Sequence, residues 1–372
     1  MRYCARCVIP ETRPNISFDA SGVCDACRRH DERASVDWAA RERRFAEIVA
    51  AAKVRGRPYD AVIPVSGGKD STWQVVTCLE RGLHVLAVTW RSPARTELGD
   101  RNLANLVSLG VDHIDFQIDP RVERRFMLRA FERFGSSGIP MHMALFNIPL
   151  GLALKFGAPL VVWGENSALE YGGPQRMAQA WRMDREWLRT YGVTQGTTAR
   201  DWISPELTAR DLTPYFGPSD AELESAGVEA LFLGHFFRWD PVATYEVAKA
   251  HGFQARPEGA ATGIYGFADV DDHFISIHHY LKWFKFGFTR TFDNLSLEIR
   301  NGRLMRDQAV EIIRARGDET PHEDIARFCE FTGITRERFF EICERFRHPA
   351  VWTRRDGHWV IAGFLVPDRV WA

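Results

Sequence analysis

The sequence predicts an α/β fold with a doubly wound parallel sheet, preceded by a small cysteine-rich module and followed by a mainly helical region. Short apolar segments alternate with helical ones between residues 60 and 163, as in parallel α/β domains. Four of the 7 cysteines lie within the first 27 residues. From about residue 289 the apolar residues recur at helical spacing. We place the three regions at residues 1–34, 35–288 and 289–372.

The cysteines of the N-terminal module form two C-x-x-C pairs, Cys4 with Cys7 and Cys24 with Cys27, separated by 16 residues. This spacing is typical of a structural zinc site, in which two turns present four thiolates to one tetrahedral ion. Two incidental pairs, or a redox dithiol, are the alternatives. We therefore expect residues 1–34 to form a zinc-ribbon-like module that is too small to have much core of its own.

Amphipathic and apolar segments define the elements of the central domain. A helix is expected at 37–54, where apolar residues recur at helical spacing. Gly82 and Gly110 are expected to end two of the following helices. In chain order the expected elements are strand 60–65, helix 72–81, strand 84–89, helix 101–109, strand 113–118, helices 122–134 and 142–156, strand 160–163 and strand 230–233.

Residues 165–228 interrupt this alternation and show no clear period. So long an insertion in a compact domain is usually a lid or a binding region, and we interpret it as the substrate-binding part of the domain. The tryptophans within 163–202 are expected mainly to pack, with a sugar-stacking face as the alternative. In the C-terminal region we expect helices at 289–300, 305–316, 322–332 and 335–346, and short strands within 358–365.

A glycine-rich loop connects the first strand to the next helix. Glycines and small residues at such a turn let backbone N–H groups close on an anion, and the helix N-terminus adds partial positive charge. The loop departs from the Walker A pattern because its lysine is followed by aspartate, a residue suited to Mg²⁺ on phosphates. The sequence therefore predicts a site for a phosphate chain, formed by Ser66, Gly67, Gly68, Lys69, Asp70, Ser71 and Thr72.

The loop sequence Ser-Gly-Gly-Lys-Asp-Ser resembles the PP-loop of the N-type ATP pyrophosphatases, which have a HUP-like doubly wound fold. The resemblance implies that the loop holds the β- and γ-phosphates of ATP while a substrate oxygen attacks the α-phosphorus. AMP and pyrophosphate would then be released. It also implies ATP and Mg²⁺ as cofactors, Lys69 and Asp70 as catalytic residues, and Asp70 as the magnesium ligand.

Further blocks of sequence, in unbroken order, resemble the N-acetyl sugar amidotransferase family. They lie at 4–14, 22–27, 93–99, 111–116, 164–173, 233–241 and 278–282, so the resemblance spans about residues 1–316. It implies that a sugar N-acetyl group, on a sugar expected to be nucleotide-linked, becomes an acetamidino group. The amide oxygen is adenylated and ammonia then displaces AMP. Family members serve the biosynthesis of bacterial surface glycans such as the O-antigen of lipopolysaccharide.

Candidate site residues follow the fourth strand or lie within the resembling blocks. Glu165 ends that strand, at the sheet edge where ligands bind in open α/β folds. We expect it to be a third catalytic residue, as a ligand of Mg²⁺ or of the substrate; a carboxylate that braces the loop is the alternative. The candidates for substrate contacts are Arg95, Asn166, Glu170, Tyr171, His279 and Lys282.

The ammonia for this reaction needs a source. A glutaminase needs a nucleophilic cysteine with a histidine partner, and neither Cys78 nor Cys329 nor Cys343 has such a setting. We therefore expect a separate glutaminase subunit to supply ammonia. The resemblance implies one similar to the glutaminase of imidazole glycerol phosphate synthase, with a cyclase-like companion as a candidate conduit.

Charge and hydropathy exclude several other classes of protein. With 48 Lys and Arg against 49 Asp and Glu, the net charge of −1 provides no basic field for nucleic acid. We expect a cytoplasmic enzyme without membrane contact, because no apolar run approaches the roughly 18 residues needed to span a bilayer. The main alternative is a PP-loop sulfur transferase that thiolates tRNA, since some of these also carry C-x-x-C pairs. A non-enzymatic zinc module on an inactive nucleotide fold would not explain the intact loop.

Overall fold

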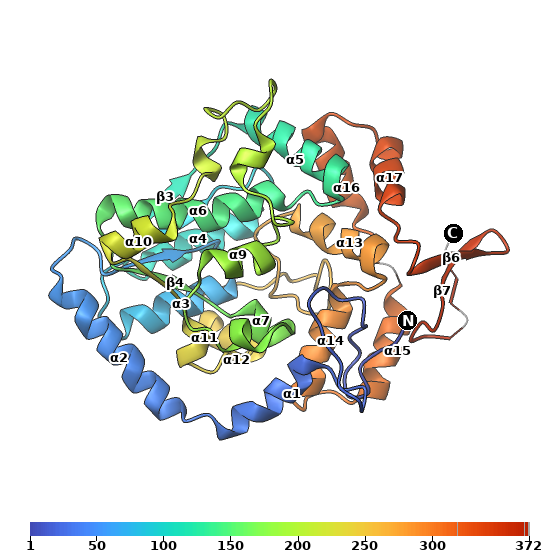
Figure 1. Cartoon of the computed structure of the whole chain (residues 1–372), viewed down its shortest axis with the longest axis horizontal. Helices are drawn as coiled ribbons and strands as arrows, with labels where there is room; N and C mark the ends of the chain where they lie inside the picture. Colours follow the sequence, from blue (N-terminus) through green and yellow to red (C-terminus); the bar gives the residue numbers. More distant parts are fainter. Residues whose placement is uncertain (318, 368, 371–372) are drawn as a thin grey trace.

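The computed structural model describes residues 1–317, 319–367 and 369–370. A parallel sheet in the order β3-β2-β1-β4-β5 lies within the α/β domain, on the opposite side of the molecule from the C-terminal hairpin (Figure 1). Its strands are β1 (Ala61–Pro64), β2 (Val85–Trp90), β3 (Asp112–Phe116), β4 (Leu160–Trp163) and β5 (Glu229–Phe232). Each strand predicted for the central domain is present, with ends that differ by at most two residues. The predicted fold class is therefore confirmed.

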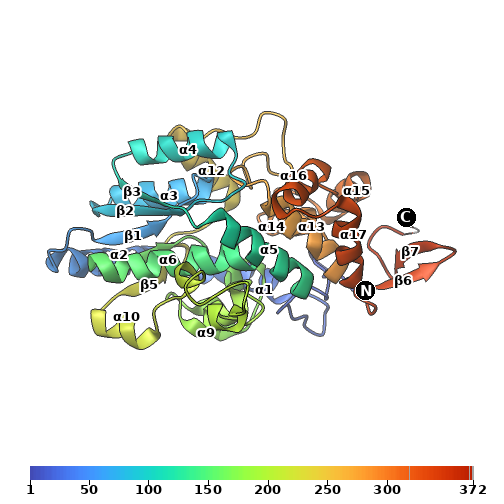
Figure 2. The same cartoon turned by 90° about the horizontal axis from the view of Figure 1, so that it is seen from above.

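Successive residues of the strands alternate between two apolar cores, as expected for a sheet buried on both faces. Val62 of β1 packs in the core of α5 (Pro120–Phe134) and α6 (Ile139–Phe156). Its neighbours Ala61 and Ile63 pack in the core of α2 (Trp38–Val54), α3 (Lys69–Leu79) and α4 (Glu97–Ser108). Figure 2 shows α3 and α4 on one side of the sheet and α6 on the other, so the sheet is doubly wound.

Four helices of the central domain, α3 to α6, begin two to four residues earlier than the sequence predicted, and the structure shows the cause for α3 and α4. Helix α3 begins at Lys69 instead of residue 72, because the extended Gly68 is its N-cap. Helix α4 begins at Glu97 instead of residue 101, because the Thr96 hydroxyl accepts a hydrogen bond from the Gly99 N–H at 2.8 Å. Both changes lengthen the helices at the carboxyl edge of the sheet, where the first turn of α3 carries the lysine and aspartate of the glycine-rich loop.

Helix α6 is the most apolar of the long helices. By length and composition alone its 18 residues, with a mean hydropathy of 1.3, would suffice to cross a membrane, contrary to the expectation from the sequence. In the structure 50% of this segment is buried, and its apolar residues pack in the core beneath β1 and β2. The position of α6 against the sheet accounts for its hydropathy.

The insertion between β4 and β5 folds into short helices. Trp187 and Trp202 are 4% and 3% exposed and pack in the core of α5 and α6, as expected for tryptophans that mainly pack. The elements of the insertion are α7 (Ser167–Tyr171), α8 (Gln175–Gln179), α9 (Arg185–Tyr191), α10 (Asp220–Ala226) and two 3-10 turns, Ala199–Trp202 and Thr213–Tyr215.

Helices are the main regular elements of the chain after β5. They are α11 (Leu233–Phe236), α12 (Pro241–Ala250), α13 (Ile275–Phe286), α14 (Arg290–Arg300), α15 (Arg306–Arg316), α16 (His322–Thr332) and α17 (Arg336–Arg345). The last four agree with the predicted helices to within one residue. Strands β6 (Trp352–Arg355) and β7 (His358–Ile361) form an antiparallel hairpin where the sequence predicted short strands.

The N-terminal module contains α1 (Asp25–Glu32) and a 3-10 turn (Arg33–Ser35), and packs against the distant C-terminal helices. Val8 lies in one core with Phe288 and Phe292. The Arg306 Nε donates a hydrogen bond to the Cys7 carbonyl at 3.1 Å. Figure 1 shows this module beside α14 and α15. The module therefore shares the core of the C-terminal region, in keeping with its small size.

Candidate active site

A cavity of about 440 Å³ lies at the carboxyl ends of β1, β2, β4 and β5. The chain order of the strands reverses between β1 and β4, and open α/β sheets bind ligands at such a switch point. The predicted site residues that line it are Ser66, Gly68, Lys69, Asp70, Ser71, Arg95, Glu165 and Tyr171. The predicted residues that do not line it are Gly67, Thr72, Asn166, Glu170, His279 and Lys282.

The glycine-rich loop, residues 66–71, wraps around the N-terminus of α3 and is called the phosphate loop below. Gly67 has φ +87°, and a Cβ there would lie 2.7 Å from the backbone nitrogen of Leu103, so only glycine fits. The hydroxyls of Ser71 and Thr72 donate to the Gly68 carbonyl at 2.9 and 3.1 Å. Thr72 thus supports the loop from within the helix. The first N–H groups of α3 have no partner within the helix and can bind an anion.

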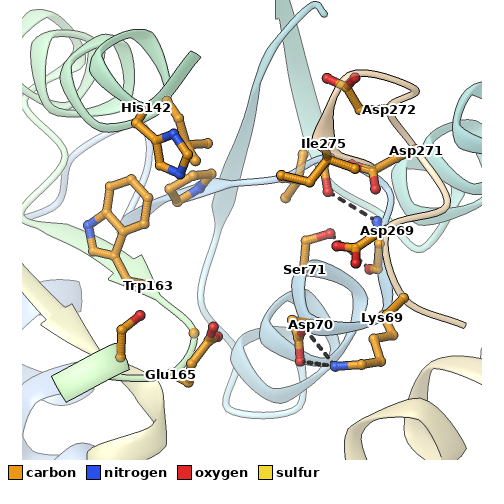
Figure 3. A pocket seen from close by; sticks show the side chains of 18 of the residues that line it. Lys69, Asp70, Ser71, His142, Trp163, Glu165, Asp269, Asp271, Asp272 and Ile275 are labelled. Carbon is orange, nitrogen blue, oxygen red and sulfur yellow. Dashed lines mark hydrogen bonds and ion pairs between the residues drawn. The ribbon is translucent and has the colours of Figure 1, made fainter. Parts of the chain in front are cut away.

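Lys69 and Asp70 form an ion pair at the cavity wall (Figure 3). The Lys69 Nζ lies 2.7 Å from both carboxylate oxygens of Asp70. Lys69 as a whole is 5% exposed. The indole N–H of Trp239 and the hydroxyl of Thr244 donate to Asp70 Oδ1 at 3.0 and 3.3 Å. Asp70 therefore holds the lysine in place, and its oxygens are of the kind that Mg²⁺ prefers.

Glu165 follows β4 and reaches the same cavity from the neighbouring strand (Figure 3). Burial raises the pKa of Glu165 to about 7, and the negative charge of Asp70 adds to this effect. Such a carboxyl group can change its protonation state near neutral pH, which suits a group that exchanges protons or accepts a cation.

Three aspartates that the sequence reasoning missed line the cavity on the side of the phosphate loop. Burial raises the pKa of Asp271 to about 6 and also raises that of Asp272. Burial opposes the ionisation of Asp269, but the charges of Arg290 and His279 outweigh it and hold the pKa of Asp269 well below its usual range. His279, a predicted site residue, lies behind the cavity with its Nε2 3.3 Å from Asp269 Oδ2.

The segment 269–272 precedes α13 and is fixed by contacts with α4. The Thr96 N–H donates to the Asp271 carbonyl at 3.1 Å, and a Cβ at Gly99 would lie 2.7 Å from the Asp271 Cα. The signal in the sequence is the run Asp-Val-Asp-Asp. No regular element leads into this run, so its place at the sheet edge could not be inferred.

Arg95 lines the cavity, but its guanidinium is already engaged. Its Nη1 and Nη2 donate to the two oxygens of Asp115 at 2.9 and 2.6 Å, and Nη1 also lies 3.3 Å from Asp100 Oδ1. Its side chain is 8% exposed. In the structure Arg95 therefore joins β3 to α4, and its contact with a substrate stays a prediction.

Asn166 and Glu170 brace the α7 wall of the cavity, residues 165–173, from behind. The side chain of Asn166 accepts hydrogen bonds from the Ala168 N–H and the Trp187 indole N–H, both at 3.0 Å. Glu170 forms an ion pair with Arg33, and the two side chains are 4% and 12% exposed. Both arrangements indicate support of the wall, and substrate contacts by these two residues stay predictions.

Side chains of the N-terminal module also form hydrogen bonds with the backbone of the α7 wall. Asp25 Oδ2 accepts a hydrogen bond from the Gly173 N–H at 2.9 Å, and Arg29 donates to the Ala168 carbonyl at 3.1 Å. Gly172 has φ +102°, and a Cβ there would lie 2.8 Å from the Asp25 carboxylate. A larger residue would push the module and the wall apart.

A second contact of the N-terminal module reaches Tyr171 and the charges behind it. The Arg13 guanidinium lies 5.0 Å from the centre of the Tyr171 ring and forms an ion pair with Asp293. Asp293 also lies 3.2 Å from Lys282 Nζ and 3.9 Å from Arg290, which lines the cavity. Burial lowers the pKa of Lys282 to about 8. Lys282 thus neutralises Asp293, and neither residue lines the cavity.

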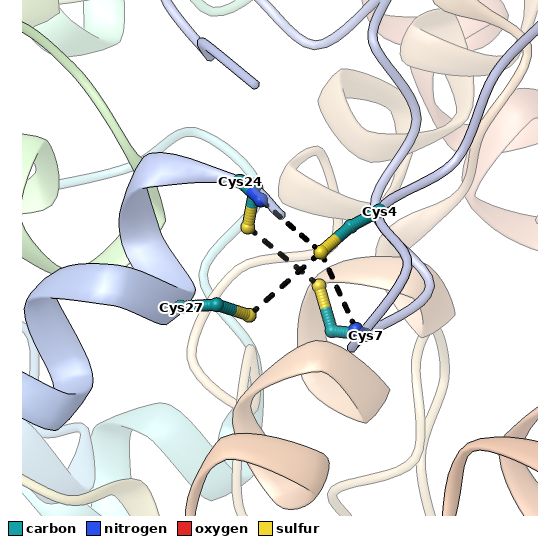
Figure 4. A group of neighbouring side chains, drawn as sticks. All are labelled: Cys4, Cys7, Cys24 and Cys27. Carbon is teal, nitrogen blue, oxygen red and sulfur yellow. Dashed lines mark hydrogen bonds between the residues drawn. The ribbon is translucent and has the colours of Figure 1, made fainter. Parts of the chain in front are cut away.

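The four cysteines of the N-terminal module converge on one point (Figure 4). Their Sγ atoms lie within 4.8 Å of one another, with Cys4 and Cys27 at 4.0 Å and Cys7 and Cys24 at 3.8 Å. All four are fully buried, and none is in a disulfide. Zinc–sulfur bonds of about 2.3 Å in a tetrahedron separate the sulfurs by about 3.8 Å, so the donor set fits a structural zinc ion.

Comparison with known proteins relates the C-terminal part of the chain to a family. Residues 261–365 match the model of the C-terminal domain of WbpG-like lipopolysaccharide biosynthesis proteins. This match confirms the family resemblance that the sequence blocks indicated. Among solved structures, that of NMN synthetase from Francisella tularensis is 12% identical, with a TM-score of 0.34 over 80% of this chain and 94% of that chain. That likeness is too slight to bear on the fold or the activity. No curated protein matches the chain.

Proposed function

We propose that this chain, a relative of the WbpG-like lipopolysaccharide biosynthesis proteins, is an ATP-dependent amidotransferase that converts an N-acetyl sugar into an acetamidino sugar. One observation carries the proposal: the phosphate loop and Glu165 line one cavity from neighbouring strands at the switch point of the sheet. A nucleotide and a second substrate can therefore meet there.

The chemistry explains why ATP is needed. An amide carbon resists ammonia because oxide is a very poor leaving group. When the amide oxygen attacks the α-phosphorus of ATP, pyrophosphate leaves and the oxygen becomes part of AMP. Ammonia can then add to the former amide carbon, and the C–O bond breaks with AMP as the leaving group. The products are the amidine, AMP and pyrophosphate.

The residues of the cavity have distinct roles in this reaction. The N-terminus of α3 and Lys69 bind the leaving pyrophosphate, because positive charge and N–H donors stabilise it as its charge increases. Asp70 would hold Mg²⁺, which when bound neutralises charge on the phosphates. Glu165 orients the acetamido group by accepting a hydrogen bond from its N–H. The buried walls exclude water from the adenylated sugar.

The N-terminal module would hold one structural Zn²⁺ through Cys4, Cys7, Cys24 and Cys27. Its contacts with the α7 wall give the ion a role in shaping the cavity without any part in the chemistry. Four thiolates close the coordination shell of such an ion, as in structural zinc sites.

Ammonia would come from a separate glutaminase subunit in the cytoplasm, where ATP is available. Burial raises the pKa of Cys78 to about 12 and raises that of Cys343, which makes both poor nucleophiles. Neither these cysteines nor Cys329 lines the cavity. Their positions also disfavour the thiolation of tRNA, which commonly uses further cysteines at the active-site cleft.

The test is product analysis with a panel of nucleotide-linked N-acetyl sugars, ATP, Mg²⁺ and ammonium salt. We expect AMP and pyrophosphate in equal amounts, and a sugar whose mass falls by the difference between O and NH. We also expect glutamine not to replace ammonia with the isolated chain. ADP and phosphate as products, or an unchanged sugar, would contradict the proposal.

A further inference from the structure

His142, in the first turn of α6, lines the cavity although no sequence pattern singled it out. Figure 3 shows it on a different side of the cavity from Lys69. Its ring lies 6.5 Å from that of Phe146, which in turn lies 4.9 Å from the ring of Trp163. His142 therefore belongs to the aromatic part of the cavity, away from the phosphate loop.

The hydrogen bond of His142 fixes which ring nitrogen can accept a proton. Nδ1 lies 2.7 Å from the Gly138 carbonyl oxygen. A carbonyl oxygen only accepts, so Nδ1 carries the hydrogen and Nε2 carries the lone pair. Among the residues that the structure describes, none forms a hydrogen bond with Nε2. The cavity thus contains a neutral imidazole whose basic nitrogen is free.

Burial keeps His142 neutral in the ligand-free chain. Burial lowers the pKa of His142 to about 4, and the positive charge of Lys282 contributes. The neighbouring ring is that of His278, at 5.4 Å. The phosphates of bound ATP would add negative charge to the cavity, which favours protonation of the imidazole at that stage.

The second half of the proposed reaction requires a base. When ammonia adds to the protonated adenylated amide, its nitrogen becomes a cationic –NH₃⁺ group on the tetrahedral carbon. This group must lose one proton before its lone pair can expel AMP. The C–O bond then breaks, AMP leaves, and the sugar keeps an amidinium group. No oxidant or other reactant is needed.

We propose that His142 is the catalytic base that takes this proton through Nε2. The inference rests on the proposed function and assigns a separate residue to its ammonia step. Glu165 is the other candidate acceptor that lines the cavity, but the proposed function already uses its carboxylate to accept the hydrogen bond of the acetamido N–H. The carboxyl group of Glu165 and the imidazole of His142 therefore serve different half-reactions.

The test separates the two half-reactions in the full-length chain. Sugar-dependent exchange of labelled pyrophosphate into ATP reports adenylation, and amidine formation at saturating ammonia reports the whole reaction. In His142→Gln we expect exchange within a few-fold of wild type and amidine formation reduced about a hundredfold or more, the usual contribution of a general base. His142→Asn, whose amide can keep the hydrogen bond to Gly138, should show the same split.

Two controls make the result specific. His278→Gln removes the neighbouring imidazole, which does not line the cavity, and should leave both activities near wild type. Added imidazole should restore amidine formation to His142→Ala, which a merely structural role would not allow.

The outcomes distinguish this inference from the proposed function. Normal amidine formation in His142→Gln and His142→Asn would overturn the inference alone, as would an equal loss of exchange and amidine formation in both. Absence of sugar-dependent exchange in the wild-type chain would overturn the proposed function, and the inference with it.

Discussion

The phosphate loop and the α7 wall face each other across the cavity, but they are held in place in different ways. The phosphate loop is continuous in sequence and is shaped mainly by the strand and helix that flank it, and Trp239 and Thr244 add hydrogen bonds to Asp70. The α7 wall is held from outside by Asp25, Arg29 and Arg33, which lie more than 130 residues away in the chain. Under the proposed function we therefore expect ATP binding to depend on local structure and sugar binding to depend on the N-terminal module.

The largest effect is expected from Lys69→Ala, which removes the cation of the phosphate loop. The change removes the buried cation that would stabilise the leaving pyrophosphate, and formation of AMP and pyrophosphate should fall about a thousandfold or more. The fold should persist, because Asp70 keeps its hydrogen bonds with Trp239 and Thr244. Near-normal AMP formation, with native circular dichroism, would remove Lys69 from the mechanism.

Glu165→Gln tests the carboxylate of the α7 wall that lines the same cavity as the phosphate loop. The amide keeps the size of the side chain but loses its charge. We expect ATP affinity, measured by calorimetry, to stay within a few-fold while amidine formation falls about a hundredfold or more. Normal turnover with the correct sugar and saturating ammonia would show that Glu165 only braces the loop.

Loss of zinc should impair the α7 wall and leave the phosphate loop largely unaffected. Elemental analysis of the wild type should find one zinc per chain, and Cys24→Ser should abolish it and lower the Tm by about 5 °C or more. Sugar binding should weaken much more than ATP binding, because the module that contacts the α7 wall loosens. Wild-type protein without stoichiometric metal, purified without chelator, would contradict the zinc assignment.

Arg33→Met removes a contact between the N-terminal module and the α7 wall without altering the four cysteines. The variant leaves Glu170 buried without its partner, and loss of one partner of a buried pair costs about 3–5 kcal/mol. The KM for the sugar should rise and the KM for ATP should not. The matched control is Arg44→Met, whose pair with Glu47 has side chains 58% and 65% exposed and is worth at most about 1 kcal/mol. Equal effects of the two variants on the sugar KM would refute the bracing role.

The smallest expected effect is a pH dependence of stability. Glu165 has an ordinary pKa of 4.5 and a pKa of about 7 in the fold, so the unfolded chain loses its proton first as pH rises. The contribution of Glu165 to stability is therefore complete below about pH 4.5 and is lost as pH rises to about 7. Relative to wild type, Glu165→Gln should gain stability across this window in chemical denaturation. A difference that is constant with pH would mean that Glu165 ionises normally.

The features that the sequence could predict are those with a local cause. The strands, the phosphate loop and the position of Glu165 follow from apolar runs, glycines and the rule that ligands bind at the carboxyl edge of a parallel sheet. The paired spacing of the cysteines likewise predicted their convergence.

The features that were missed depend on tertiary packing. Asp271 reaches the cavity because its segment packs on the start of α4, and His142 because the first turn of α6 lies at the sheet edge. Conversely, Glu170 and Asn166 lie in a block that resembles a substrate site, but Arg33 and Trp187 engage their side chains. Such contacts between distant residues leave no periodic or spacing signal in the sequence.

The most direct test of the central claim follows the amide oxygen. An N-acetyl sugar that carries a heavy oxygen isotope in its acetyl carbonyl is incubated with the chain, ATP, Mg²⁺ and ammonia. If that oxygen attacks the α-phosphorus, the isotope must appear in the phosphate of AMP, and the amidine must contain none of the acetyl oxygen. Unlabelled AMP, or label retained in the sugar, would contradict adenylation of the amide.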